Sequence, residues 1–258
     1  WMGVGLLFGL ASAANFYYGL VTAMLLAVWS IVKVFPLVRE GARPTREVLA
    51  GPARGVGVAL AVSLPFWLAF QWTLHSANAL IVRPKEFAVG WVLSHNAVDP
   101  RTYFVPGDFQ SVDLSTYGEA FVHTGYLRWT VIALAIVGVW KNARLRPWLW
   151  AAGVSLIFGL GPILYWGEWV KLGGHAVSLP FYWAQLLLPD VAITHPLRLS
   201  IGGQVVLGLL AAAGAARLKW RSVSLVAGVL IMVESLAVSP GPWPVPTSDA
   251  SIPDVYAT

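Results

Sequence analysis

The chain contains no cysteine among its 258 residues, and only 11% of its residues are charged. Without cysteine the protein can form neither a disulfide framework nor a metal site with thiolate ligands. A soluble domain usually has about a quarter of its residues charged. The low charge, together with 57% hydrophobic residues and a mean hydropathy of +0.69, therefore indicates a membrane protein rather than a soluble one.

The sequence also lacks the short motifs of common soluble enzymes. It has no Walker A loop, no His-Glu-x-x-His zinc motif, no Gly-x-Ser-x-Gly nucleophile turn and no glycine-rich dinucleotide fingerprint. The chain by itself should therefore not drive transport with ATP. The sequence indicates no cofactor, and the missing motifs do not exclude binding of a divalent metal.

The basic residues are concentrated in three short segments between apolar runs. These segments hold 11 of the 17 lysines and arginines: Lys33, Arg39, Arg43, Arg46 and Arg54; Lys141, Arg144 and Arg146; Arg217, Lys219 and Arg221. Short basic loops that alternate with long mixed-charge loops are typical of polytopic membrane proteins, in which the basic loops are cytoplasmic. Because topology accounts for the net charge of +5, we expect no nucleic-acid partner.

Seven apolar runs can be placed as membrane spans, at residues 1–14, 19–35, 55–72, 126–140, 148–166, 199–218 and 223–238. The first and the fourth are short for a bilayer, which needs about 20 apolar residues. The sequence therefore predicts an all-α fold, a polytopic transmembrane helical bundle of about seven spans. Two long external loops, 73–125 and 167–198, are expected to contain short helices, and membrane lipid is an expected partner.

Residues 1–238 are predicted to form the transmembrane domain, and the proline-rich residues 239–258 an external lead-in to a further C-terminal region. Trp1 rather than Met begins the chain, and the chain stops within its proline-rich tail without a recognisable C-terminal feature. We therefore expect the chain to be a piece of a longer protein.

A first candidate site lies in the first long loop, where His95, Asp99 and Arg101 fall within one turn-rich stretch. A cation and a carboxylate this close together can bind a sugar phosphate and orient its hydroxyl groups. The alternative is a solvent-exposed loop whose ion pair contributes little.

A second candidate site lies at the predicted external end of the sixth span, where Arg198 follows His195-Pro196-Leu197. The planar, permanently charged guanidinium of arginine suits phosphate, so the pattern predicts a contact with a lipid-linked phosphate. The alternative is an interfacial arginine that only meets lipid headgroups.

Two features inside the predicted spans also stand out. Glu234 lies in the seventh span, where a carboxylate is costly and therefore often functional. The alternative is that the Glu234 side chain reaches water or pairs with a neighbouring span. The sixth span carries Gly202, Gly203, Gly208 and Gly214, and such small residues predict close packing against neighbouring helices.

A series of short motifs precedes an Ala/Leu/Gly-rich helix, and the motifs are Gly159-Leu160-Gly161-Pro162, Leu179-Pro180-Phe181, Leu188-Pro189 and His195-Pro196-Leu197-Arg198. This series resembles the later membrane helices of large bacterial polytopic proteins, the YfhO-like and related GT-C-type glycosyltransferase families. Arg198 matches the last arginine of the family pattern, whereas His195 stands where an arginine is more usual. The turn at residues 15–18 and the region of Tyr126 are also similar.

The resemblance implies the membrane region of a GT-C-like glycosyltransferase. Such enzymes transfer a sugar from a polyprenyl-phosphate carrier during cell-envelope glycan or glycolipid assembly. The expected location is the bacterial inner membrane, with the long loops and the C-terminal end on the periplasmic side. The family's catalytic carboxylate is expected upstream of Trp1, so no catalytic residue is assigned. A non-catalytic membrane protein that binds or translocates a lipid-linked glycan is the second hypothesis.

Overall fold

The computed structural model describes residues 1–39, 46–75, 98–106, 125–140, 142–187, 193 and 195–238. Within these ranges the chain is mostly helical, which confirms the all-α prediction. The longer helices are α1 (Met2–Ala14), α2 (Phe16–Arg39), α3 (Arg46–His75), α5 (Trp129–Trp140), α6 (Arg146–Gly159), α8 (Ser200–Ala215) and α9 (Arg221–Ala237). The predicted lead-in at 239–258 lies outside the described residues.

Each of the seven predicted spans overlaps one of these helices, but the helices differ in length. Among the described residues, two segments are long and apolar enough to cross a membrane, Ala50–Thr73 and Pro196–Ala215. Helices α5 and α6 have 12 and 14 residues. At a rise of 1.5 Å per residue they extend only about 20 Å, which is shorter than the roughly 30 Å hydrocarbon core of a bilayer. The helical fold is therefore confirmed, whereas the count of seven spans is not.

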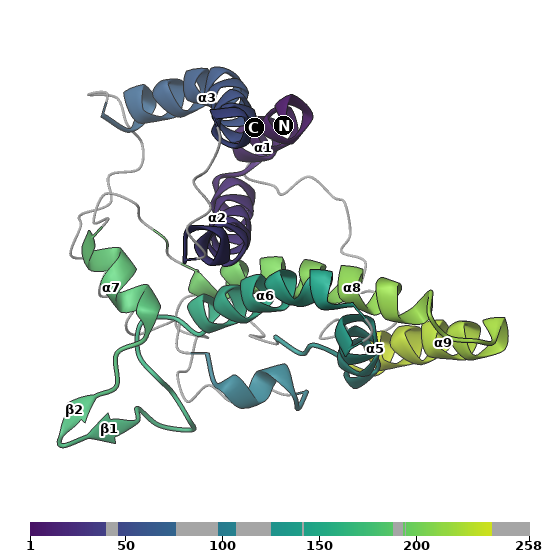
Figure 1. Ribbon diagram of the computed structural model, residues 1–258. Helices are drawn as coiled ribbons and strands as arrows, with labels where there is room; N and C mark the ends of the chain where they lie inside the picture. The colour runs from purple at the N-terminus through teal and green to yellow at the C-terminus, as the bar shows by residue number, and fades with distance from the viewer. Residues whose placement is uncertain are drawn as a thin grey trace, which may run out of the picture.

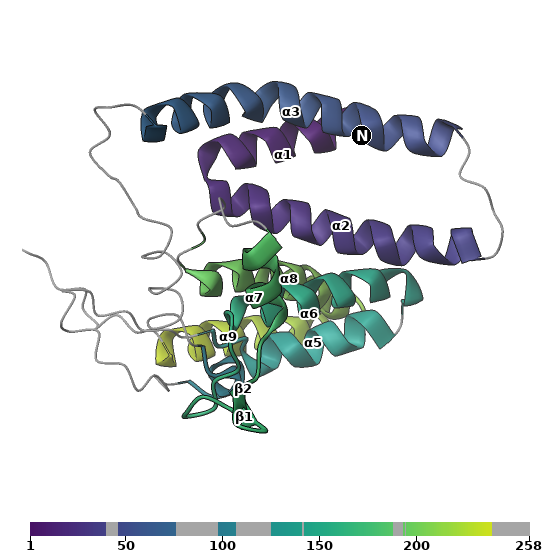
Figure 2. The ribbon, with the colours of Figure 1, turned by 90° about the vertical axis from the view of Figure 1, so that its left-hand side faces the viewer.

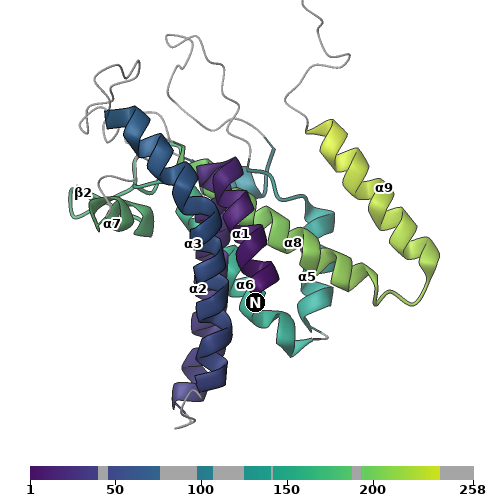
Figure 3. The same ribbon diagram turned by 90° about the horizontal axis from the view of Figure 1, so that it is seen from above.

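The helices are arranged in layers (Figures 1 and 2). In Figure 2, α3 and α1 lie together at the top, α2 runs beneath them, and α6 and α8 follow, with α5 and α9 below. Viewed from above in Figure 3, α9 turns back from the end of α8 at an angle. This arrangement places α8 in the middle of the C-terminal half of the protein.

Helix α8 supplies much of the main hydrophobic core. Its buried Val206, Leu207, Leu210 and Ala211 pack with residues of α5 and α6, which include Leu134, Ala135, Val139 and Ala152. Burial of such side chains is the main favourable contribution to packing in water, whereas between helices in lipid the close van der Waals contact matters most.

Three of the four glycines in α8 lie at helix contacts, as predicted. A Cβ atom added at Gly202 would lie 2.7 Å from the Ser155 hydroxyl oxygen, and one at Gly203 would lie 2.7 Å from Cγ of Leu156, both on α6. A Cβ at Gly214 would collide with the Leu134 carbonyl oxygen of α5. Gly208 differs, because an added Cβ there would meet open space.

Shorter elements gather at the end of the bundle where α6 ends and α8 begins. They are the 3-10 helices η1 (Pro100–Tyr103) and η4 (Pro196–Leu199), helix α7 (Pro180–Leu187), and strands β1 (Lys171–Leu172) and β2 (His175–Ala176). A third 3-10 helix, η3 (Ala143–Leu145), connects α5 to α6 at the other end. The predicted short helices in the long loops are therefore present among the described residues.

The β1–β2 hairpin was not predicted. Its two-residue turn is Gly173-Gly174, with φ of +60° and +83°, and the strands pair Lys171 with Ala176 and Leu172 with His175. Two consecutive residues with positive φ form the type I′ turn that joins tight hairpins, and glycine adopts it without strain. The Gly173-Gly174 pair therefore indicates a hairpin from sequence alone, although only short helices were predicted in this loop.

Candidate functional site

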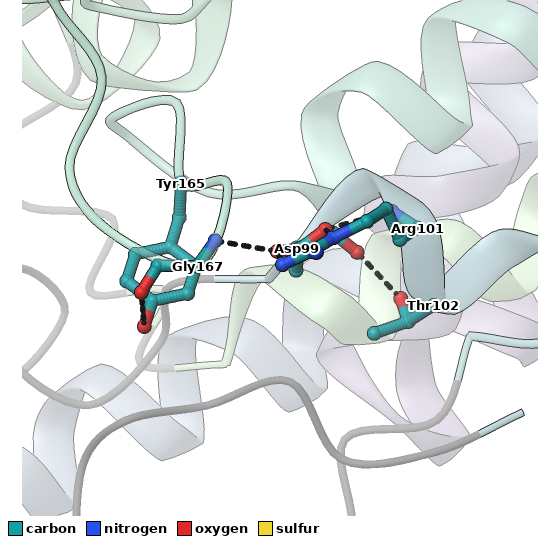
Figure 4. Close-up of polar contacts among 5 residues, drawn as sticks. All are labelled: Asp99, Arg101, Thr102, Tyr165 and Gly167. Carbon is teal, nitrogen blue, oxygen red and sulfur yellow. Dashed lines mark hydrogen bonds and ion pairs between the residues drawn. The ribbon is translucent and has the colours of Figure 1, made fainter. Parts of the chain in front are cut away.

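The Asp99–Arg101 pair predicted from sequence forms in the structure, and its carboxylate is buried. The Asp99 side chain has no exposed surface, and Arg101 approaches it through two nitrogens, with Nε 3.0 Å from Oδ1 and Nη2 2.6 Å from Oδ2. The backbone N–H of Arg101 also donates to Oδ1, over 2.9 Å (Figure 4). The alternative of an exposed ion pair is therefore wrong for Asp99, although Arg101 keeps about a third of its side chain exposed.

Asp99 also connects two loops that are distant in sequence. The Gly167 N–H donates to Asp99 Oδ2 over 2.7 Å, and the Tyr165 hydroxyl donates to the Gly167 carbonyl over 2.7 Å (Figure 4). The Arg101 guanidinium lies 5.2 Å from the centre of the Trp166 ring. Gly167 adopts φ of +71°, which a glycine reaches without strain and which aims its N–H at the carboxylate.

The hydrogen bonds keep Asp99 ionised. Burial by itself raises the pKa of Asp99, but hydrogen bonds from Arg101 and the Gly167 N–H, together with the Arg101 charge, bring the pKa below its ordinary value of 3.8. The carboxylate accepts four hydrogen bonds, about the number that its two oxygens can hold. This geometry favours a role in positioning the loops, and sugar-phosphate binding by the pair stays a prediction.

A second cluster joins the start of α2 to the start of α8. The His195 backbone N–H donates to the Tyr17 hydroxyl over 3.1 Å, and the Arg198 guanidinium lies 5.1 Å from the centre of the Tyr17 ring. The Asn15 side chain accepts a hydrogen bond from the Tyr17 N–H over 2.8 Å, which caps the first turn of α2 and fixes Tyr17 there. Tyr17 therefore lies beside His195 and Arg198, although about 180 residues separate it from them in sequence.

Arg198 occupies an exposed position in this cluster. Pro196 begins η4 directly after His195, and Leu199, at the end of η4, is buried, with its carbonyl accepting a 2.5 Å hydrogen bond from Ser155 on α6. Within the described part of the chain, no carboxylate pairs with Arg198. A cation held over an aromatic ring and left without a carboxylate partner can receive an anionic ligand.

The C-terminal end of α6 brings both clusters to the same end of the bundle. The buried Tyr103 of η1 donates its hydroxyl to the Leu156 carbonyl over 2.7 Å, and the Val98 N–H donates to the Leu160 carbonyl over 3.4 Å. Gly159 makes this meeting possible, because an added Cβ would lie 2.8 Å from Ser200 Cβ and 2.9 Å from the Tyr103 hydroxyl.

Of the five residues predicted for the two sites, the structure places four. His95 lies outside the described residues. Tyr17 was missed, although the turn that contains it, Asn15-Phe16-Tyr17-Tyr18, stood out as a polar and aromatic interruption between two apolar runs. Contact between that turn and Arg198 depends on how α2 packs, which the sequence pattern does not report.

Among the described ranges, no three histidine, aspartate or glutamate side chains gather closely enough to hold a metal ion. Comparison of the chain with protein-family models, with curated proteins and with solved structures gave no match.

Proposed function

We propose that the chain is a polytopic membrane region that binds a lipid-linked phosphate at the outer end of α8. The proposal is supported by seven helices of 12 to 30 residues that each overlap an apolar run and by the three short basic segments. On this proposal the protein has about seven spans in a bacterial cytoplasmic membrane. The long loops and the C-terminal end face the periplasm.

The observation that carries the proposal is the position of Arg198. Its exposed guanidinium lies over the Tyr17 ring at the predicted membrane surface, and no described carboxylate neutralises it. The fork of N–H donors on an arginine matches the oxygens of a phosphate, and a half-solvated site at the interface strengthens that attraction relative to bulk water. A polyprenyl-phosphate-linked sugar has its phosphate at this depth, with the lipid in the membrane and the sugar outside.

The motif resemblance extends this proposal to a reaction. The chain would be part of a GT-C-like glycosyltransferase that acts in cell-envelope glycan or glycolipid assembly. Arg198 would stabilise the phosphate as it leaves the sugar, and a carboxylate, to which no residue of this chain is assigned, would deprotonate the acceptor.

A second candidate is a non-catalytic protein that binds or translocates a lipid-linked glycan. The observation that favours it is the Asp99 carboxylate, whose acceptor positions are filled by Arg101 and Gly167. A carboxylate bonded in this way is a poor general base, because proton abstraction requires a free acceptor position and a pKa closer to neutral.

The binding proposal can be tested with Arg198→Ala and Arg198→Lys in the longest available form of the protein. Loss of a charge-assisted contact worth about 1.5–3 kcal/mol should weaken binding of a polyprenyl-phosphate sugar roughly tenfold to a hundredfold. Lysine should restore only part of the affinity, because an ammonium lacks the bidentate fork. Arg144→Ala is the matched control, since Arg144 is exposed in a short basic segment.

Binding by the purified variants can be measured by native mass spectrometry, with helical content and thermal unfolding recorded for each. Equal affinity of Arg198→Ala and the parent protein would refute the proposed contact. Sugar transfer to an added acceptor then separates the two candidates. Binding without transfer by the full-length protein supports the non-catalytic function, and transfer supports the enzyme.

A further inference from the structure

A cavity of about 170 Å³ lies between α5, α8 and α9, and none of its lining residues belongs to either cluster. Its lining is apolar at Val131, Leu207 and Ile231 and polar at Arg128, Gln204 and Ser235. Gly208 forms part of the α8 wall, and its missing side chain leaves this space open. The volume suits a phosphate group and the first part of a hydrocarbon chain, and is too small for a whole lipid.

The polar end of the cavity depends on Arg128, which precedes α5. Arg128 has φ of +62°, the only positive φ among the described non-glycine residues. A bulky side chain adopts this conformation only when its surroundings impose it, and such residues concentrate at functional sites. The Nε of Arg128 donates to the Ser235 hydroxyl over 2.6 Å, and that hydroxyl donates to the Ile231 carbonyl over 2.6 Å.

The carboxylate next to Ser235 does not neutralise Arg128. Glu234 accepts the Thr130 N–H at 3.2 Å and the Tyr126 hydroxyl at 3.4 Å, and it thereby caps the start of α5. No ion pair joins Glu234 to Arg128, and within the described ranges the terminal guanidinium nitrogens have no hydrogen-bond acceptor. The sequence left open whether Glu234 is functional or reaches water or a neighbouring helix. In the structure its carboxylate accepts hydrogen bonds at the start of the neighbouring helix α5.

Gln204 gives a second, independent indication of a ligand. It is a polar residue in the second turn of the apolar helix α8, it is half-buried, and its amide has no hydrogen-bond partner among the described residues. At the membrane depth that the proposed function gives α8, a polar side chain without a partner is costly. An anionic ligand between Gln204 and Arg128 would supply the acceptors that both side chains lack.

We propose that this cavity binds the phosphodiester of a membrane phospholipid, with the phosphate at Arg128 and Gln204. One acyl chain would begin beside Gly208 and lie against Val131 and Ile231 in the lining of the cavity. The proposal depends on the membrane location in the proposed function, and it is independent of the donor site at Arg198. The bound lipid would fill the space between α8 and α9 and hold the two helices together.

Two variants test the site from different sides. Gly208→Leu fills the space for the chain, and Arg128→Gly removes the guanidinium while keeping a residue that adopts positive φ without strain. Each should weaken binding of phosphatidylglycerol at least tenfold in a native mass spectrometry titration of the purified protein. Gly153→Leu on α6 is the matched control, because an added Cβ there also meets open space and Gly153 does not line the cavity.

The titration is repeated with Arg198→Ala and with inorganic phosphate as competitor. Unchanged phosphatidylglycerol binding in Arg198→Ala, with its loss in the two cavity variants, supports two separate sites. The proposal would be overturned if both cavity variants bound phosphatidylglycerol as well as the parent protein does. Displacement of the lipid by millimolar phosphate would also overturn it, because such displacement indicates a site for free anions. Donor-sugar binding measured on the same samples reports separately on the proposed function.

Discussion

The contact between α5 and α8 can be tested with one added methyl group. In the structure Gly138 and Gly214 allow the two backbones to approach each other directly. An added Cβ at Gly214 would collide with the Leu134 carbonyl oxygen and lie 3.1 Å from the Gly138 nitrogen. At Gly208 on the same helix an added Cβ would meet nothing within 4 Å. We therefore expect Gly214→Ala to destabilise the protein and Gly208→Ala to be neutral or stabilising.

The magnitude follows from two terms. Replacement of glycine by alanine inside a helix favours the helix by about 1 kcal/mol, and this term is the same at both positions. Overpacking at Gly214 should cost about 1–3 kcal/mol, because the colliding group is backbone and the helices must separate to relieve it. The propensity term cancels in the comparison, so Gly214→Ala should be less stable than Gly208→Ala by about 1–3 kcal/mol.

Unfolding of the purified variants in mixed detergent micelles can be followed by the fluorescence of the 14 tryptophans. Gly138→Ala should behave like Gly214→Ala, since its Cβ would collide with the Leu210 carbonyl oxygen. The double variant should lose less than the sum of the single losses, because one separation of the helices relieves both collisions. Equal stability of Gly214→Ala and Gly208→Ala would refute the direct backbone contact.

Two further predictions concern pH and topology. The folded-state pKa of Asp99 is lowered, so its contribution to stability should be complete above the ordinary pKa of 3.8 and should be lost as the pH falls through the folded value. Asp99→Asn should lower the free energy of unfolding at pH 7 by about 1–3 kcal/mol and flatten its acid dependence, and parallel acid profiles for parent and variant would contradict this. A reporter active only outside the cytoplasm should give signal when fused near Asp108 and none near Arg144. Signal at Arg144 would mean that one of the second, third or fourth predicted spans does not cross.

The pairing of Asp99 with Arg101 could be predicted from the sequence, whereas the burial of Asp99 could not. Two residues separated by one proline in a turn-rich stretch are close in almost any compact conformation, so the sequence could indicate the pair. The burial of Asp99 was not predictable, because it depends on Gly167, which lies 68 residues later in the chain. The same contact decides whether the carboxylate is a solvated charge or a buried one.

The Arg198 site shows the same division. The position of Arg198 after Pro196 and before an apolar run indicated the start of a helix and a cation at its outer end. The Tyr17 ring that lies by the guanidinium comes from the other end of the chain, and the cavity beside Arg128 combines residues of α5, α8 and α9. No local pattern in the sequence relates these segments to one another.

The sequence by itself determined the helices, their order and the basic segments between them. Helix formation depends on hydrogen bonds and side chains within a few residues, and charge segregation depends on composition, so both can be recognised locally. The hairpin at Gly173-Gly174 was also locally encoded and was overlooked. Only the tertiary structure decided which glycines lie at helix contacts, which carboxylate is buried and which cations lack a described carboxylate partner. Those properties depend on atoms that approach from distant parts of the chain, and packing alone brings them together.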